Sequence, residues 1–346
     1  MDPLARRKLG RTNIEVTQLG FGGAGLGDLF DVVEDADANA TLQAAWDAGI
    51  RYYDTSPWYG RGQSEHRFGR ALYRRPRAEY VLSTKVGRLF RAFHDADKFE
   101  HGFWRGGLKF QHRFDYSYDG VMRSFEDSLQ RLGQPRIDLL LIHDLDISHH
   151  ATDAKVTAFL TELHNGGFRA LTELKQAGQI SGIGAGINEL GMMPRFLDLM
   201  DIDFFLVALP YTLLDTDVLD SEFPRCIERD VGFVIGAPFA SGILATGAAP
   251  GARYRYADAT PEILAKVKRI QAVCARHKVP LPAAALQFPL GHPAVASVIP
   301  GALLPEQVAR NVATFRHAIP ADFWAELKHE GLLRSDAPVP PTPPPR

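Results

Sequence analysis

The chain is 346 residues long, which is enough for one large α/β domain or for two ordinary domains. Its 45% hydrophobic and 23% charged residues are typical of a globular protein, and a formal net charge of −2 gives no electrostatic basis for binding nucleic acid or an anionic membrane. Its two cysteines do not form a CxxC pair, which argues against a disulfide scaffold or a thiolate metal site. Because no signal-type segment or membrane-length apolar run is present, we expect a cytoplasmic protein.

The N-terminal segment predicts a β-hairpin, because two β-rich stretches, 7–9 and 14–16, flank the turn sequence GRTN. After this hairpin, short apolar runs alternate with longer helical stretches. The apolar runs, each the length of a buried strand, are 18–21, 52–55, 80–86, 137–143, 180–185, 204–209, 232–237 and 295–299. The helical stretches lie near 39–49, 64–74, 117–132, 153–177, 189–199, 217–229, 261–290 and 305–316.

This alternation predicts a single (β/α)8 TIM barrel with an N-terminal β-hairpin and long βα loops. Nearly continuous apolar strands are typical of a parallel sheet that helices cover on its outer face. We expect the barrel to span 1–335 and the Pro-rich tail, 336–346, to be extended and flexible. A doubly wound sheet is the alternative, but the glycine-rich sequence GFGGAGLG lacks the strand–turn–helix context of a dinucleotide fingerprint.

Two long connections, 88–118 and 144–152, follow predicted strands. The first is rich in aromatic and basic residues. Since long loops at the carboxyl ends of barrel strands usually build the active site, it is predicted to form a pocket wall. The alternative is a packed structural excursion.

Four polar side chains fall at or beyond the ends of three successive predicted strands. Asp54 closes the second run and Tyr59 follows it, Lys85 lies near the end of the third, and His143 ends the fourth. In a barrel these strand ends are neighbours, so the four are predicted to converge on one mouth. A lysine within an apolar strand is costly to bury unless it is paired, and Asp54 is the obvious partner.

Such a group can exchange a proton with one carbonyl or alcohol oxygen. A tyrosine with a pKa of about 10 exchanges protons poorly at neutral pH. The Lys85 ammonium is expected to lower the pKa of Tyr59, with Asp54 holding the lysine charged, while His143 donates a hydrogen bond to the substrate.

Other interpretations stay open. Asp54 and Lys85 could form a structural ion pair, and His143 could be a structural histidine. The barrel could be a non-enzymatic module that senses a nicotinamide cofactor. A metallohydrolase would need more ligands than His149–His150 or His143–Asp144 provide, so no metal is expected.

In this order and spacing, YYDTSPWYG, LSTKVG and LLLIHD resemble motifs of the aldo-keto reductases, NAD(P)-dependent oxidoreductases with a (β/α)8 barrel. RKLGRTNIEVTQLGFGG resembles the family's hairpin and first strand, and SVIPGALLPEQVARN resembles its cofactor segment. The resemblance covers residues 6 to about 317. It implies Tyr59 as general acid/base, Lys85 and Asp54 as the residues that tune it, and His143 as the residue that orients the substrate.

The resemblance also implies a cofactor site. The segment APFASGIL aligns with the loop over the pyrophosphate, and the segment after the last strand aligns with the cradle of the adenosine end, where Asn311 would reach the adenine. The cofactor-binding residues implied in this way are Asp54, Ser241, Gly242, Leu244, Pro300, Gly301, Gln307 and Asn311.

This chain departs from the family's NADP pattern. Relatives that prefer NADP place cations just after Pro300 and at 307, whereas here Gly301 and Gln307 stand at those positions. Without those cations a 2′-phosphate loses charge-assisted hydrogen bonds worth roughly 1.5–3 kcal/mol each. We therefore expect NAD as the cofactor, with NADP possible through Arg310.

A second departure concerns the nicotinamide ring. Gly186 replaces a serine that binds the carboxamide in many relatives, which makes Asn188 the nearest polar substitute. The position of the family's stacking tyrosine falls at Gly236, with Phe239 as a candidate replacement.

HDLD, GIGAGINE and APFASGIL most resemble a branch of aldose dehydrogenases that oxidise the C1 hydroxyl of L-fucose, L-galactose or D-arabinose to lactones. We therefore expect a small-molecule sugar substrate bound by Trp58, Tyr59 and His143, with Trp58 stacking on it. Pyridoxal-oxidising relatives and general aldehyde reductases are the alternatives. The protein is expected to be a monomer or a homodimer.

Overall fold

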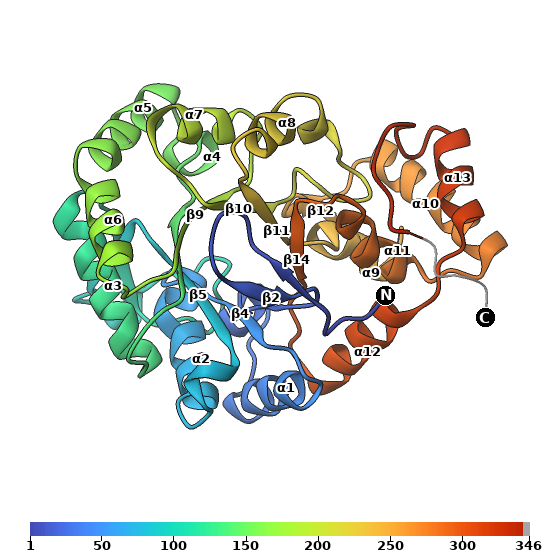
Figure 1. The fold of residues 1–346 in the computed structure, drawn as a ribbon. Helices are drawn as coiled ribbons and strands as arrows, with labels where there is room; N and C mark the ends of the chain where they lie inside the picture. The colour runs from blue at the N-terminus through green and yellow to red at the C-terminus, as the bar shows by residue number, and fades with distance from the viewer. Residues whose placement is uncertain (342–346) are drawn as a thin grey trace.

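The computed structural model describes residues 1–341, and its central feature is a parallel sheet with the strand order β14-β11-β10-β9-β8-β5-β4-β3 (Figure 1). The sheet closes on itself, because Val298 N donates to Gln18 O and Gly20 N donates to Val298 O, each at 2.9 Å. The predicted (β/α)8 barrel is confirmed. Its strands are β3 (Phe21–Gly22), β4 (Tyr52–Asp54), β5 (Val81–Val86), β8 (Leu139–His143), β9 (Gly182–Ile187), β10 (Phe204–Ala208), β11 (Gly232–Gly236) and β14 (Val295–Ile299).

Helices surround the barrel, as expected for strands with two apolar faces (Figure 1). The predicted helix at 153–177 is divided by a π-helical turn at Leu163–Gly167, and the helix at 321–329 was not predicted. The helices are α1 (Asp35–Asp47), α2 (Gln63–Leu72), α3 (Tyr118–Leu132), α4 (Ile147–His150), α5 (Asp153–Glu162), α6 (Phe168–Gln176), α7 (Met192–Leu199), α8 (Glu222–Ile227), α9 (Ile243–Thr246), α10 (Pro261–His277), α11 (Leu281–Gln287), α12 (Pro305–Arg316) and α13 (Ala321–His329).

The predicted N-terminal hairpin forms from β1 (Arg6–Lys8) and β2 (Glu15–Thr17) and lies across one end of the barrel (Figure 1). Its Leu9 and Val16 join Tyr52, Leu141 and Phe204 in a compact apolar cluster. This cluster fills the barrel interior and closes its amino-terminal end. The carboxyl ends of the strands are therefore the end that is left for a site.

The chain after the last helix does not leave the barrel at once. Ala337 is 1% exposed, so the part of the predicted flexible tail that is described, 336–341, begins packed on the protein. The rest of that tail, 342–346, lies outside the described residues. None of the helices within 1–341 has the length and apolar character needed to span a bilayer.

Candidate active site

The barrel brings the four predicted acid–base residues together at the carboxyl ends of neighbouring strands. Asp54 ends β4 and pairs in register with Ser83 of β5, while Lys85 of the same strand pairs with Leu141 of β8. His143 is the last residue of β8. Tyr59 opens the 3₁₀ turn that follows β4.

Lys85 and Asp54 form a buried ion pair. Lys85 Nζ lies 2.7 Å from Asp54 Oδ2 and also donates to the Thr55 carbonyl at 2.8 Å, and both charged residues are 1% exposed. Ser83 Oγ donates to the other carboxylate oxygen at 2.7 Å. Burial raises the pKa of Asp54, and the ammonium and hydroxyl donors oppose this. A buried pair is tolerated only when its remaining polar groups are bonded in this way.

Tyr59 lies beside the ammonium. Lys85 Nζ is 4.6 Å from the centroid of the phenol ring. Burial raises the pKa of Tyr59 well above its usual value of 10.0, Asp54 and Asp144 add to this, and Arg88 opposes it. The expected lowering of the pKa of Tyr59 is therefore wrong for this pocket, because desolvation outweighs the nearby positive charge. The phenol is held as a proton donor.

His143 is neutral and has a defined tautomer. Burial lowers its pKa well below 6.5. Arg88 Nη1 lies 3.3 Å from His143 Nδ1, and a guanidinium can only donate, so Nδ1 is an acceptor. Ser56 Oγ lies 2.9 Å from the same nitrogen and itself accepts from Trp58 N. The ring hydrogen is therefore on Nε2, which is the arrangement needed to donate to a substrate oxygen.

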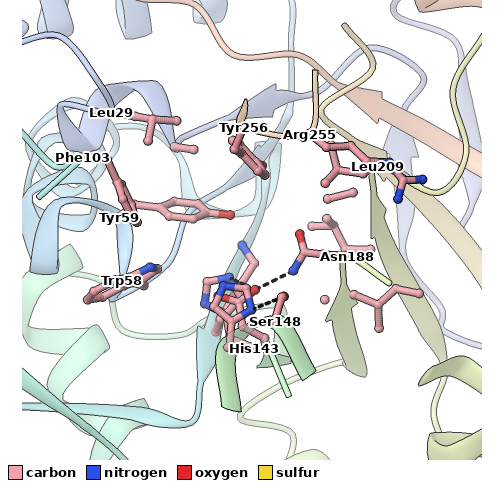
Figure 2. Close-up of a pocket in the computed structure, with 18 of the residues that line it drawn as sticks. Leu29, Trp58, Tyr59, Phe103, His143, Ser148, Asn188, Leu209, Arg255 and Tyr256 are labelled. Carbon is pink, nitrogen blue, oxygen red and sulfur yellow. Dashed lines mark hydrogen bonds and ion pairs between the residues drawn. The ribbon is translucent and has the colours of Figure 1, made fainter. Parts of the chain in front are cut away.

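Tyr59, Lys85 and His143 line a cavity of about 460 Å³. Figure 2 shows Leu29, Trp58, Tyr59 and Phe103 on one side of it, facing Asn188, Leu209 and Arg255 on the other. His143 and Ser148 lie at its base and Tyr256 at its opposite end. One wall is aromatic and the other carries hydrogen-bonding groups, so a flat ring with polar substituents fits the cavity.

The long connection predicted as a pocket wall contributes two aromatic residues. It folds into an antiparallel hairpin of β6 (Arg88–Ala92) and β7 (Phe110–Phe114), and its tip brings Phe103 and Trp104 into the cavity lining. Trp58 also lines the cavity, but the Arg88 guanidinium lies 4.8 Å and the His112 ring 4.4 Å from its ring centroid. Part of the Trp58 surface that was expected to stack on the substrate is thus occupied by protein.

A second hairpin, which the sequence did not indicate, brings Arg255 and Tyr256 to the cavity. Its strands are β12 (Arg253–Tyr254) and β13 (Ala257–Asp258), and the two residues between them have φ of 49° and 63°. Positive φ at both positions of a two-residue turn is usually supplied by Asn and Gly, so Arg-Tyr gave no turn signal. Tyr256 N donates to Ser241 Oγ at 2.9 Å, which ties the hairpin to the predicted pyrophosphate loop.

The predicted adenosine residues also assemble. Gly22 N donates to Pro300 O at 3.1 Å, Asn311 Nδ2 donates to Gly301 O at 3.4 Å, and Gln307 Oε1 accepts from an amide of the same loop. Their chemistry fits the adenosine end of a nicotinamide dinucleotide, because backbone and neutral amide groups surround an exposed glycine at 301. None of these residues lines the cavity that holds Tyr59 and His143.

The pyrophosphate loop fits the same group. Gly242 has φ of +105° and open space where a Cβ would stand, so its backbone is accessible. Leu244 is buried beneath it. Ser241 has φ of 63° and accepts a hydrogen bond while its own hydroxyl hydrogen stays available to an anion.

The nicotinamide end differs from the expectation for two residues. Phe239 does not line the cavity, whereas Leu206 does, and a Cβ on Gly236 would lie 2.9 Å from Leu206 Cδ2. Leu206 thus fills the space where the family's stacking tyrosine would begin. Asn188 does line the cavity, but its amide nitrogen already donates to Asp144 at 2.9 Å. Only its carbonyl oxygen is left to meet a carboxamide.

One group of side chains has the spacing of a metal site. Asp144, Asp146 and His149 offer ligand atoms within 4.8 Å of one another. Arg88 Nη2 lies 2.9 Å from Asp144, and His149 Nδ1 lies 2.7 Å from Asp146, so the carboxylates are already paired. His150 turns to a buried tyrosine hydroxyl, 3.2 Å away. The cluster is an ion-pair network at the base of the cavity.

Fold and site define a (β/α)8-barrel protein with a buried acid–base group at the carboxyl ends of its strands. Residues 18–330 match the Aldo/keto reductase family. The chain is 46% identical to a pyridoxal 4-dehydrogenase of Microbacterium luteolum, with 95% of this chain and 98% of that protein covered. It is 37% identical to a D-threo-aldose 1-dehydrogenase of a Pseudomonas species, with 92% and 95% covered. An aldo-keto reductase of Bacillus halodurans, solved in its holo form, matches with a TM-score of 0.74 and 25% identity over 96% of this chain and 98% of that one.

The chain therefore belongs to the aldo/keto reductase family, as the sequence motifs indicated. It is an oxidoreductase of the family that uses nicotinamide nucleotides.

Proposed function

We propose that this enzyme oxidises the hydroxyl of a cyclic hemiacetal to a lactone, with NAD as the preferred hydride acceptor. The observation that carries this proposal is that Tyr59, Lys85 and His143 line one cavity, with Asp54 bonded to Lys85 behind it. Aldoses form such hemiacetals at C1. Pyridoxal forms one between its aldehyde and the neighbouring hydroxymethyl group. The two named relatives thus act on chemically equivalent centres.

The residues have distinct roles in this reaction. His143 Nε2–H donates to the oxygen of the reacting carbon and fixes its position. Tyr59, as phenolate, accepts the hydroxyl proton, and the adjacent Lys85 ammonium stabilises that phenolate while Asp54 keeps the lysine charged. A bound nicotinamide supplies the acceptor for the hydride that leaves the same carbon. In the reverse direction Tyr59 returns the proton.

Pyridoxal is the first candidate substrate. Tyr59, Phe103 and Trp104 form a continuous aromatic wall, with the Tyr59 and Trp104 ring centroids 5.8 Å apart and those of Phe103 and Trp104 5.1 Å apart. The face of a flat pyridine ring can stack on this wall. The 46% identity to a pyridoxal 4-dehydrogenase supports the same choice.

An aldose of the L-fucose, L-galactose or D-arabinose type is the second candidate. Ser148, Asn188 and Glu189 on the opposite wall can bind ring hydroxyls, and a D-threo-aldose 1-dehydrogenase is 37% identical. NAD is preferred because the adenosine cradle has no cation at Gly301 or Gln307 to pair with a 2′-phosphate. The free, buried Cys226 and Cys274 suit a reducing cytoplasm.

A substrate panel tests this proposal. Purified enzyme is given NAD or NADP with pyridoxal, L-fucose, L-galactose, D-arabinose or D-glucose, the reduced nicotinamide is followed by absorbance, and the product is identified by mass spectrometry. Reduction of NAD by pyridoxal with lactone formation supports the first candidate, and turnover of the sugars alone supports the second. Reduction of simple aldehydes by NADPH, with no oxidation of any panel member, would make the protein a general aldehyde reductase. Cofactor binding without turnover in either direction would indicate a cofactor-sensing module.

A further inference from the structure

We propose that Arg88 is a positioning residue for this reaction, which holds His143 as an Nε2–H donor and keeps Asp144 from capturing that hydrogen. The inference rests on the proposed function for its kinetic consequences, but its structural part stands on the contacts of Arg88 alone. No motif of the sequence distinguished this arginine from the other cations of its loop.

Arg88 is directed into the site by the residue before it. Gly87 has φ of +110°, and a Cβ there would lie 2.3 Å from Cε1 of Tyr116. Only glycine fits this approach, and the chain can then turn at the end of β5 so that the next side chain points inward. Arg88 is 3% exposed, although it is the first residue of a hairpin that ends in solvent.

Two aromatic rings fix the guanidinium. Its central carbon lies 4.8 Å from the ring centroid of Trp58 and 4.7 Å from that of Phe114. Its Nε is buried without a hydrogen-bond partner, so the group is held by its two terminal nitrogens and by these rings. A planar cation fixed in this way keeps a constant direction for its two donors.

Those donors contact His143 and Asp144, which lie next to each other at the base of the cavity. Nη1 lies 3.3 Å from His143 Nδ1, and Nη2 lies 2.9 Å from Asp144 Oδ2. The first contact, together with that of Ser56 Oγ at 2.9 Å, makes Nδ1 an acceptor and so places the ring hydrogen on Nε2. The second satisfies an Asp144 carboxylate whose other oxygen lies 3.4 Å from His143 Nε2.

Without Arg88 we expect the protonation of His143 to change. The charged and titratable groups around His143 are then Asp144, Lys85, His149 and Tyr59. Nδ1 keeps only its contact with Ser56 Oγ, and the Asp144 carboxylate loses its guanidinium partner and attracts a second proton onto the imidazole. Both effects favour a charged His143 that donates to Asp144 instead of to the substrate.

The test compares Arg88→Met and Arg88→Lys with Arg91→Met. Arg91 is a matched control because it lies on the same strand, is exposed and bonds only to Gln111. We expect Arg88→Met to lower kcat by about 10²-fold through misplacement of the donor, with cofactor affinity within about twofold of wild type. Its acid limb in the pH profile should move to higher pH. Arg88→Lys should return that limb toward wild type, and Arg91→Met should change neither quantity.

A second measurement does not depend on turnover and uses a substituted protein only to assign the signal. Nitrogen NMR of ring-labelled histidine in the wild-type enzyme, with the His143 signal assigned by its loss in His143→Gln, reports which ring nitrogen carries hydrogen. A hydrogen on Nε2 at neutral pH supports the proposal. A hydrogen on Nδ1, or Arg88→Met with an unchanged pH profile, overturns it whatever the substrate proves to be. Wild-type enzyme that turns over no panel substrate but has the Nε2–H form would refute the proposed function and leave the Arg88 contact in place.

Discussion

The Lys85 ammonium lies 4.6 Å from the centre of the Tyr59 ring, while its hydrogen bonds go to Asp54 and Thr55. It can therefore stabilise a phenolate once one forms, yet burial keeps the phenol protonated at neutral pH. The protonation state of Tyr59, which the Lys85 charge and burial shift in opposite directions, should therefore decide whether reduction or oxidation is faster. A protonated Tyr59 is ready to donate in a reduction, whereas an oxidation needs the phenolate.

The rate of oxidation should rise with pH. The pKa of Tyr59 is raised well above 10.0. Below that pKa, each increase of one pH unit therefore raises the phenolate fraction about tenfold. We expect kcat/KM for oxidation to increase through the alkaline range, while reduction declines there. Initial rates in both directions across pH would check this. An oxidation profile that is flat up to alkaline pH would contradict Tyr59 as the base.

Tyr59→Phe should lose activity by about 10²–10⁴-fold, which is the usual contribution of a positioned acid/base. Cofactor affinity, measured by quenching of protein fluorescence, should stay close to that of wild type. Tyr116→Phe is the control, since its hydroxyl is fully buried and donates to the His143 carbonyl but lies outside the cavity lining. Equal losses in both variants would point to packing rather than to proton transfer.

Lys85→Met should be inactive and also less stable. It leaves the Asp54 carboxylate buried without its partner, which costs about 3–5 kcal/mol in comparable pairs. The double variant Asp54→Asn/Lys85→Met should recover much of that stability in urea unfolding and none of the activity. Recovery of turnover in the double variant would show that the ion pair serves only the fold.

Gln307→Arg should shift cofactor preference toward NADP. One charge-assisted hydrogen bond to the 2′-phosphate is worth about 1.5–3 kcal/mol, or roughly a 10- to 100-fold gain in NADP affinity relative to NAD. Gln307 also accepts from the Leu303 amide at 2.6 Å, so Gln307→Met serves as the control for losing that bond. No difference between the two variants would mean that the adenosine ribose binds elsewhere.

Stability should fall on acidification because of His292. Burial against aromatic rings lowers its pKa from 6.5 to about 4. Between those values the unfolded chain binds more protons than the folded one, so the free energy of unfolding decreases as pH falls through that window. The substitution His292→Phe should reduce the slope of the unfolding free energy against pH by up to about 1.4 kcal/mol per pH unit. Urea unfolding at several pH values measures this, and an unchanged slope would rule His292 out.

Much of the site was predictable because it lies on strands. Asp54, Lys85 and His143 are recognisable from the ends of apolar runs, and parallel pairing places such ends side by side. The alternation of apolar runs and helical stretches predicted the barrel, and the turn sequence GRTN predicted its N-terminal hairpin.

The positions of Arg88, Arg255 and Tyr256 depend on loop paths that the local sequence does not encode. Arg88 appears as one of several loop cations, and only the approach of Gly87 to a distant tyrosine ring turns it inward. Arg255 and Tyr256 occupy a turn that their residue types disfavour. The pKa of Tyr59 had the wrong expected direction, because the extent of its burial depends on the whole cavity.

The central claim is hydride transfer from the hemiacetal carbon with Tyr59 taking the proton. The most direct measurement uses pyridoxal or a reactive aldose with deuterium on the carbon that bears the hydroxyl. Mass spectrometry of the reduced nicotinamide should then show the deuterium transferred stoichiometrically, at a rate that Tyr59→Phe lowers. Deuterium released to solvent, or retained in the substrate while the nicotinamide stays oxidised, would contradict the account.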